Sequence, residues 1–188
     1  MTRGKRRIAF FGGSFDPVHN GHLEMAQAAA RQLGLHQVCF VPTSANPLKS
    51  EGPRASPADR LAMLRLALAE EPRFSVWEGE IHGDGPGFTV DSAGHLERVY
   101  PNCHLFWIIG SDQLPQLPHW RSVGELVRKV GFILVRRPGH PFLWPGLPGL
   151  HLYPVDNPLN PVSSTEIRRQ AAAGELLTGS VPPAVEHY

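Results

Sequence analysis

Short apolar runs alternate with segments of helical periodicity along most of the chain, and this alternation restricts the fold more than any other feature. The expected strands are Ile8–Phe11, Val38–Val41, Phe74–Trp77, Leu105–Ile109, Phe132–Val135 and His151–Tyr153. Helical patterns occupy residues 21–33, 57–68, 90–99 and 123–129, and a last helix begins near residue 163. Such alternation over 188 residues predicts an α/β fold, a Rossmann-like doubly wound parallel sheet in a single domain.

Residues that cap helices support these boundaries. Ser56 is an expected N-cap because Pro57 follows at the first helical position. Gly34 is a natural stop for the first helix. Ser163 and Glu166 have the spacing of a capping box, which predicts the start of the last helix.

Composition and charge exclude several classes of protein. Apolar residues make up 41% of the chain and charged residues 19%, as in ordinary globular proteins, and the formal net charge is only +1. We therefore expect no nucleic-acid partner and, since no run of eighteen apolar residues occurs, no membrane span. The apolar run after the basic start is too short for a secretion signal, and Cys39 and Cys103 lack metal spacing, so a cytoplasmic protein with reduced thiols is expected. The sequence leaves self-association into a homo-oligomer open.

The first turn, "GGSFDPVHNGH", has the residues of an anion site. It lacks the glycine order of dinucleotide-binding folds and the Gly-Lys-Ser/Thr of a P-loop. Gly12 and Gly13 still permit close backbone approach, and His19 and His22 lie three residues apart at an expected helix start. Imidazole N–H groups there could donate to phosphate oxygens. A zinc site is disfavoured because a third metal ligand is missing, and a hydrolase nucleophile at Ser14 because the G-x-S-x-G turn is missing. Either histidine alone could instead be a structural cap of the helix.

The turn "NPVSSTEIR" carries a second set of anion ligands. Ser163, Ser164 and Thr165 bring three hydroxyls to a helix start, and Arg168 follows one turn later. A capping box alone explains Ser163 without any ligand. Because the carboxyl ends of parallel strands share one edge of a sheet, however, both helix starts should face the same place, where together they suit a polyphosphate.

Three further residues allow two interpretations each. Asp112, after the strand in "FWIIGSDQL", could bind ribose hydroxyls or a metal, or could stabilise a turn. Trp120 could stack on an aromatic ring or belong to the core. Lys49 could pair with a phosphate or remain solvated, and the surrounding loop at 43–57 is our candidate lid.

These residues carry a resemblance to a known family. "GGSFDPVHNGHL" resembles the G-x-F-D-P-x-H-x-G-H signature of the nucleotidyltransferase superfamily, and "VSSTEIR" resembles its second signature, I-S-S-T-x-I-R. "FTVDS", "FWIIGSDQL", "HW" and "VRRPGHP" are similar to segments of bacterial nicotinate-nucleotide adenylyltransferases. The likeness extends over nearly the whole chain, and the two signatures occur in the family's order.

The resemblance implies transfer of the adenylyl group of ATP to nicotinate mononucleotide, with Mg²⁺ and release of pyrophosphate. It also implies one nucleotidyltransferase domain over residues 1–188, with a phosphate-binding helix region from about 161. No residue is assigned to a metal. The implied site residues are catalytic His19 and His22; Gly12, Gly13, Ser14, Phe15, Gly110, Asp112, Ser164, Thr165 and Arg168 for ATP and its phosphates; and Thr43, Lys49, Thr89, Trp120 and Arg137 for the nicotinate nucleotide.

Two departures from the family pattern stand out. Leu48 occupies a position where relatives often have histidine, although Lys49 keeps the charge, and Phe88 replaces the tyrosine of a common S-Y-T. Three alternatives stay open: a sister enzyme acting on nicotinamide mononucleotide, one acting on phosphopantetheine, and a non-catalytic ATP-binding sensor. An RNA-ligand function is disfavoured, because the chain has neither room for an anticodon-binding module nor a basic face.

Overall fold

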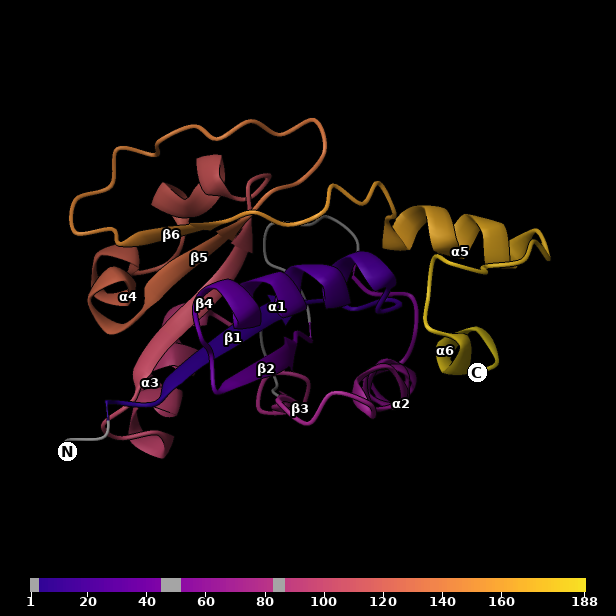
Figure 1. Cartoon of the computed structure of the whole chain (residues 1–188), viewed down its shortest axis with the longest axis horizontal. Helices are drawn as coiled ribbons and strands as arrows, with labels where there is room; N and C mark the ends of the chain where they lie inside the picture. Colours follow the sequence, from indigo (N-terminus) through magenta and orange to yellow (C-terminus); the bar gives the residue numbers. More distant parts are fainter. Residues whose placement is uncertain (1–3, 45–51, 83–86) are drawn as a thin grey trace.

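Six strands pair in parallel in the order β3-β2-β1-β4-β5-β6 (Figure 1). Their bounds are β1 Arg7–Gly13, β2 Gln37–Pro42, β3 Phe74–Val76, β4 His104–Gly110, β5 Gly131–Val135 and β6 Leu152–Val155. The computed structural model describes residues 4–44, 52–82 and 87–188. Leu48, Lys49 and the centre of the candidate lid lie outside these residues.

Helices cover both faces of the sheet. Their bounds are α1 Asn20–Gln32, α2 Pro57–Leu68, α3 Thr89–Val99, α4 Val123–Lys129, α5 Ser164–Ala172 and α6 Pro183–Glu186, with a 3₁₀ helix, η1, at Leu114–His119. In the three described stretches, none of the helices combines the length and apolar character needed to cross a membrane.

The two faces of the sheet separate the core into two clusters, because successive strand side chains point to opposite sides. Phe11 and Ile108 pack in the cluster beneath α1. Phe10 and Trp107, their neighbours along the strands, pack in the cluster beneath α3 and α4. All four side chains are at most 6% exposed. Both faces are therefore apolar, which is why the strands appear in the sequence as continuous apolar runs.

The strand order reverses between β1 and β4, which lie side by side at the centre of the sheet with Phe11 opposite Ile108. Loops leaving the carboxyl ends of these two strands diverge to opposite faces, so an open crevice forms between them. The predicted fold class is confirmed by this order and by the all-parallel pairing.

Several local predictions are refined. The last strand is Leu152–Val155 instead of His151–Tyr153, with Pro154 inside it, and β3 ends at Val76. Proline is compatible with β6 because this strand lies at the edge of the sheet. The capping box of the last helix is half formed: Ser163 Oγ accepts from the N–H of Glu166 at 3.2 Å, whereas the Glu166 carboxylate pairs with Arg169 at 2.7 Å.

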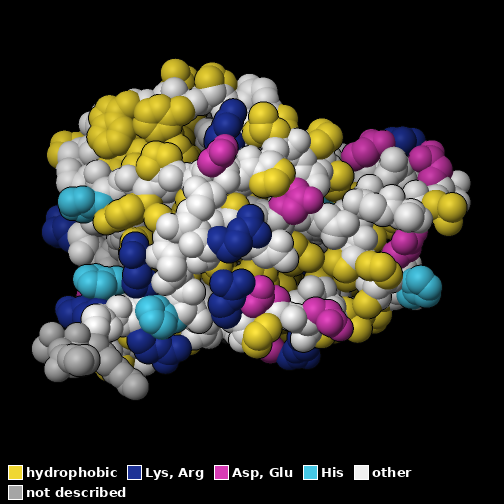
Figure 2. Space-filling view, in the orientation of Figure 1, with side chains coloured by type: hydrophobic (Ala, Val, Ile, Leu, Met, Phe, Trp, Pro, Cys, Tyr) yellow, Lys and Arg dark blue, Asp and Glu magenta, His cyan; other side chains and the backbone are white. Residues whose placement is uncertain are grey.

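The connection between β5 and β6 carries exposed apolar side chains. Phe142, Leu143 and Trp144 are 53%, 59% and 57% exposed. Figure 2 shows apolar side chains gathered at the upper left, where Figure 1 places this connection. An exposed apolar group of this kind is typical of an interaction surface.

Candidate active site

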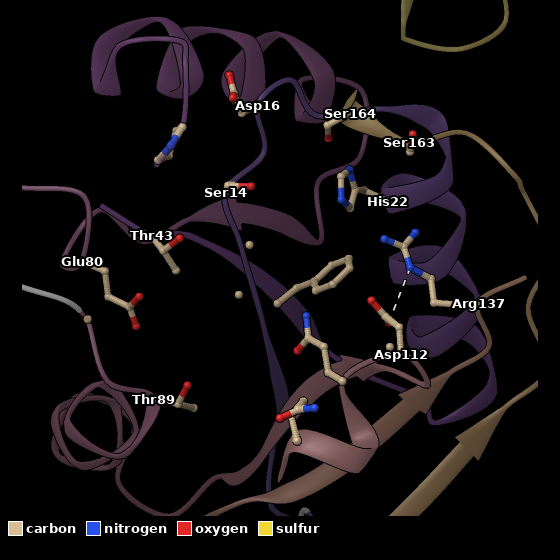
Figure 3. Close-up of a pocket in the computed structure, with 18 of the residues that line it drawn as sticks. Ser14, Asp16, His22, Thr43, Glu80, Thr89, Asp112, Arg137, Ser163 and Ser164 are labelled. Carbon is tan, nitrogen blue, oxygen red and sulfur yellow. Dashed lines mark ion pairs between the residues drawn. The ribbon is translucent and has the colours of Figure 1, made fainter. Parts of the chain in front are cut away.

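A cavity of about 920 Å³ opens at the carboxyl edge of the central strands. It is lined by the turn after β1, the turn after β4 and the starts of α1, α3 and α5 (Figure 3). Among the described residues, four cavity-lining side chains have a buried polar atom without a hydrogen-bond partner. These atoms are His19 Nδ1, Thr43 Oγ1, Asp112 Oδ1 and Trp120 Nε1. Since buried polar groups are nearly always paired, this concentration indicates a site for a polar ligand.

His19 and His22 stack on one another at the start of α1, with ring centroids 3.7 Å apart. The backbone N–H of His19 donates to Nδ1 of His22 at 3.3 Å. A neutral His22 therefore carries its proton on Nε2. Burial, with a smaller contribution from Arg137, lowers the pKa of His19 to about 3, so that its imidazole is neutral at pH 7.

The glycine pair lies in close contact with the aromatic rings behind it. A Cβ at Gly12 would lie 3.1 Å from Trp107 Cζ2, and one at Gly13 would lie 3.0 Å from Phe15 Cζ. Phe15 itself has φ +46°, a left-handed conformation that costs a non-glycine residue about 1 kcal/mol or more. Its ring is 1% exposed and lies 5.1 Å from the His22 ring, so packing holds the strained turn and supports the histidine.

The start of α5 is fastened to the turn after β1. Ser164 Oγ donates to the carbonyl of Pro17 at 3.0 Å. Arg168 Nη1 donates to the carbonyl of Asp16 at 2.6 Å and lies 3.4 Å from its carboxylate, and Nη2 donates to Thr165 Oγ1 at 3.3 Å. The starts of α1 and α5 therefore face the cavity as one unit, as the sequence predicted.

Two buried charged side chains fix the neighbouring backbone. The Asp16 carboxylate, 4% exposed, accepts from the backbone N–H groups of residues 54 and 55 at 2.8 and 3.0 Å. Arg60, 1% exposed, donates from Nη1 to the carbonyls of Ser14 and Thr43 at 2.8 and 2.7 Å. The loop preceding α2 is thereby attached to the turn after β1.

Asp112 and Arg137 form an ion pair on one side of the cavity, with 3.7 Å between Oδ1 and Nε (Figure 3). A Cβ at Gly110 would collide with the Asp112 carboxylate and lie 3.0 Å from Arg137 Cγ. Glycine at the end of β4 therefore leaves room for both side chains. The resemblance implied a place for Arg137 in the nicotinate-nucleotide pocket, yet its partner is the aspartate expected beside adenosine.

Thr43, Glu80 and Thr89 lie together on the other side of the cavity in Figure 3. Trp120 lines the cavity and is partly buried, with its Nε1 lacking a partner among the described residues. Arg121 packs over the ring of Phe88, with Cζ 4.5 Å from the ring centroid. An aromatic face, hydroxyl groups and a helix start thus surround this half of the cavity.

Most residues singled out in the sequence line the cavity. Phe15 lies behind it as a support, and Lys49 falls outside the described residues. The sequence interpretation missed Asp16, Glu80, Arg54, Gln113, Gln116, His119 and Arg121, which also line it. Asp16 belongs to the first signature and could have been found there.

Among the described residues, no group of three or more His, Cys, Asp or Glu side chains is arranged to hold a metal ion. Magnesium in nucleotide sites is bound largely by substrate phosphates and water, with one or two carboxylates.

Comparison with known proteins agrees with this geometry. The family model described as Cytidylyltransferase-like matches residues 10–170, so the fold and the site define a nucleotidyltransferase. A protein from Opitutus terrae named "Probable nicotinate-nucleotide adenylyltransferase" is 45% identical, covering 94% of this chain and 91% of its own length. One of the same name from Neisseria meningitidis serogroup B is 38% identical, with 97% and 95% covered. The chain belongs to the nicotinate-nucleotide adenylyltransferase family.

Solved structures share the fold. Plasmodium falciparum nicotinic acid mononucleotide adenylyltransferase complexed with NaAD superposes with a TM-score of 0.80 at 21% identity, covering 97% of this chain and 94% of that one. A protein from Vibrio parahaemolyticus gives a TM-score of 0.70 at 14% identity, with 97% of each chain covered. At these low identities the likeness shows a shared fold, which extends over 97% of this chain.

Proposed function

We propose that this enzyme transfers the adenylyl group of ATP to nicotinate mononucleotide, giving nicotinate adenine dinucleotide and pyrophosphate. The observation that carries the proposal, beside the family, is one cavity lined by the start of α1 with its two histidines, by the start of α5, and by Trp120, Thr43 and Thr89. A volume of about 920 Å³ is at the upper end of the usual range for ligand pockets, as two nucleotides would require.

The histidines act as hydrogen-bond donors to the reacting phosphates. The 5′-phosphate of the acceptor has a second pKa near 6 and is therefore largely a dianion at neutral pH, able to attack the α-phosphate without a general base. Neutral His19 cannot add positive charge, but its imidazole N–H can donate to an oxygen as negative charge develops. Catalysis then consists of in-line positioning and electrostatic stabilisation.

The triphosphate would lie at the start of α5. The Thr165 hydroxyl can donate to a phosphate, and the helix dipole favours an anion. Ser164 would donate to the phosphate after giving up its bond to the Pro17 carbonyl. Arg168 is held at the start of α5 by its bonds to Asp16 and Thr165. Mg²⁺ would accompany ATP, bound by its phosphates. Asp112, beside Gly110 at the end of β4, would bind the adenosine ribose.

The pyridine ring would stack on Trp120, with Thr43 and Thr89 beside the nucleotide.

The two free cysteines fit a cytoplasmic location. Self-association stays a prediction; sedimentation velocity of the wild type and of Trp144→Ser tests it at the exposed apolar side chains of residues 142–144.

The test is pyrophosphate release with ATP and Mg²⁺ and one of three acceptors: nicotinate mononucleotide, nicotinamide mononucleotide or phosphopantetheine. The proposal predicts a clear preference for the first. Turnover with phosphopantetheine alone would contradict the role of Trp120, and tight ATP binding without turnover of any acceptor would favour the sensor.

A further inference from the structure

Glu80 is a buried carboxyl group in the acceptor half of the cavity to which the reaction described above gives no role. Its side chain is 5% exposed and lines the cavity between Thr43 and Thr89, with the carboxyl group directed toward the cavity in Figure 3. Oε1 accepts a short hydrogen bond from Ser92 Oγ on α3. Oε2 lies 2.7 Å from the position that a Cβ at Gly87 would take, so glycine at 87 keeps the space beside this oxygen open.

No cation balances this carboxyl group within the described ranges, where its one side-chain partner is the Ser92 hydroxyl. Burial raises the pKa of Glu80, and the hydrogen bond from Ser92 lowers it by less. A protonated carboxyl group is a donor through its O–H, whereas an ionised one can only accept.

Two pyridine nucleotides differ at one substituent, and Glu80 can distinguish them. A ring carboxylate accepts hydrogen bonds only, while a ring carboxamide has an NH₂ group that donates. We propose that Glu80 selects the acid over the amide by donating a hydrogen bond from Oε2 to the ring carboxylate, close to the positive end of the α3 dipole. This inference rests on the proposed function, because it requires a pyridine nucleotide as acceptor.

Ionisation of Glu80 would reverse the preference. An ionised Glu80 repels a ring carboxylate and accepts from a carboxamide. The ratio of kcat/KM for nicotinate mononucleotide to kcat/KM for nicotinamide mononucleotide should therefore fall as pH rises through the Glu80 pKa. A charge-assisted hydrogen bond is strong enough for a fall of about tenfold or more.

Other ionisable groups on the adjoining elements already have partners. Glu78 pairs with Arg65 and with His82, Asp91 lies 3.9 Å from Arg121, and His95 stacks on Trp77. The histidines at the start of α1 and the ion pair of Asp112 with Arg137 contact the phosphates and ATP in our proposal. An effect of pH on contacts to the phosphates and ATP is common to both acceptors and cancels in the ratio.

The experiment measures this ratio between about pH 5 and pH 9, the range that a buried glutamate can reach. The wild type should show a ratio that falls with pH. Glu80→Gln keeps the shape of the side chain and donates at every pH, so its ratio should not vary with pH. Glu78→Gln, two residues away and outside the cavity lining, is the matched control and should keep the wild-type profile.

Ser92→Ala separates this role from a purely structural one. Loss of the Ser92 hydrogen bond removes the contribution that lowers the Glu80 pKa, so the fall in the ratio should move to higher pH. A ratio that is flat in the wild type, or a fall that survives unchanged in Glu80→Gln, would overturn the inference and leave the proposed function intact. Failure of both pyridine nucleotides to react would refute the proposed function itself.

Discussion

Protonation of His19 should make the protein sensitive to acid in a way that can be calculated. The pKa of this histidine is about 3 in the folded protein against an ordinary value of 6.5, chiefly because the ring is buried. Between these two values the unfolded chain binds a proton that the native protein does not. The contribution of His19 to stability is therefore fully present above about pH 6.5 and is lost as pH falls toward 3.

The size of the effect follows from the two pKa values. Lowering the pH from 7 to 5 protonates His19 in the unfolded state only, and the free energy of unfolding falls by about 2 kcal/mol. The size of this loss in the free energy of unfolding is set by the pKa of His19 in the unfolded state, and it changes little as long as the native pKa is below about 4.5. The His19→Gln variant has no ionisable group at this position and should not show this part of the loss.

Urea unfolding at pH 7 and pH 5 measures the effect as a double difference between wild type and His19→Gln. The wild type should lose about 2 kcal/mol more than the variant over this interval. His104→Gln, at an exposed position at the start of β4, is the control and should lose as much as the wild type. Equal losses in wild type and His19→Gln would refute the neutral, buried His19.

Three further substitutions test the site and its support. His22→Ala should lower kcat about 100-fold, because one donor to the developing charge is removed; pyrophosphate release measures it, and a near wild-type kcat would contradict the assignment. Arg168→Ala should raise the KM for ATP about tenfold or more with little change for the acceptor, and a rise confined to the acceptor KM would move Arg168 to the other substrate. Arg60→Met should lower the free energy of unfolding by about 2–4 kcal/mol, since the buried carbonyls of Ser14 and Thr43 lose their donor; unchanged stability in urea would show that other groups satisfy them.

The sequence predicted the elements that local patterns determine. Apolar runs predicted the strands because both faces of the sheet are buried, and Ser56 with Pro57 located the start of α2. Local patterns could not fix the bounds of the last strand, because these depend on pairing with β5, and they predicted no element where the structure has η1. These elements depend on contacts with distant parts of the chain.

The site likewise contains residues that local sequence patterns predicted and residues that only the folded structure reveals. The turns after β1, β4 and β6 were predicted to meet because the carboxyl ends of parallel strands share one edge. Glu80 was missed because nothing in its local sequence distinguishes a buried carboxyl group from a solvated one. Its burial arises only when the segment after β3 packs against Ser92 on α3. The partner of Arg137 likewise became visible only in three dimensions.

The most direct test of the central claim, a single in-line transfer between two bound nucleotides, is the stereochemical course at the α-phosphorus. ATP made chiral by sulfur at that phosphorus should react with nicotinate mononucleotide to give a dinucleotide of inverted configuration, because the acceptor phosphate attacks opposite the departing pyrophosphate. Retention of configuration would require two successive displacements through a covalent enzyme intermediate. That result would contradict an active site whose histidines only donate hydrogen bonds.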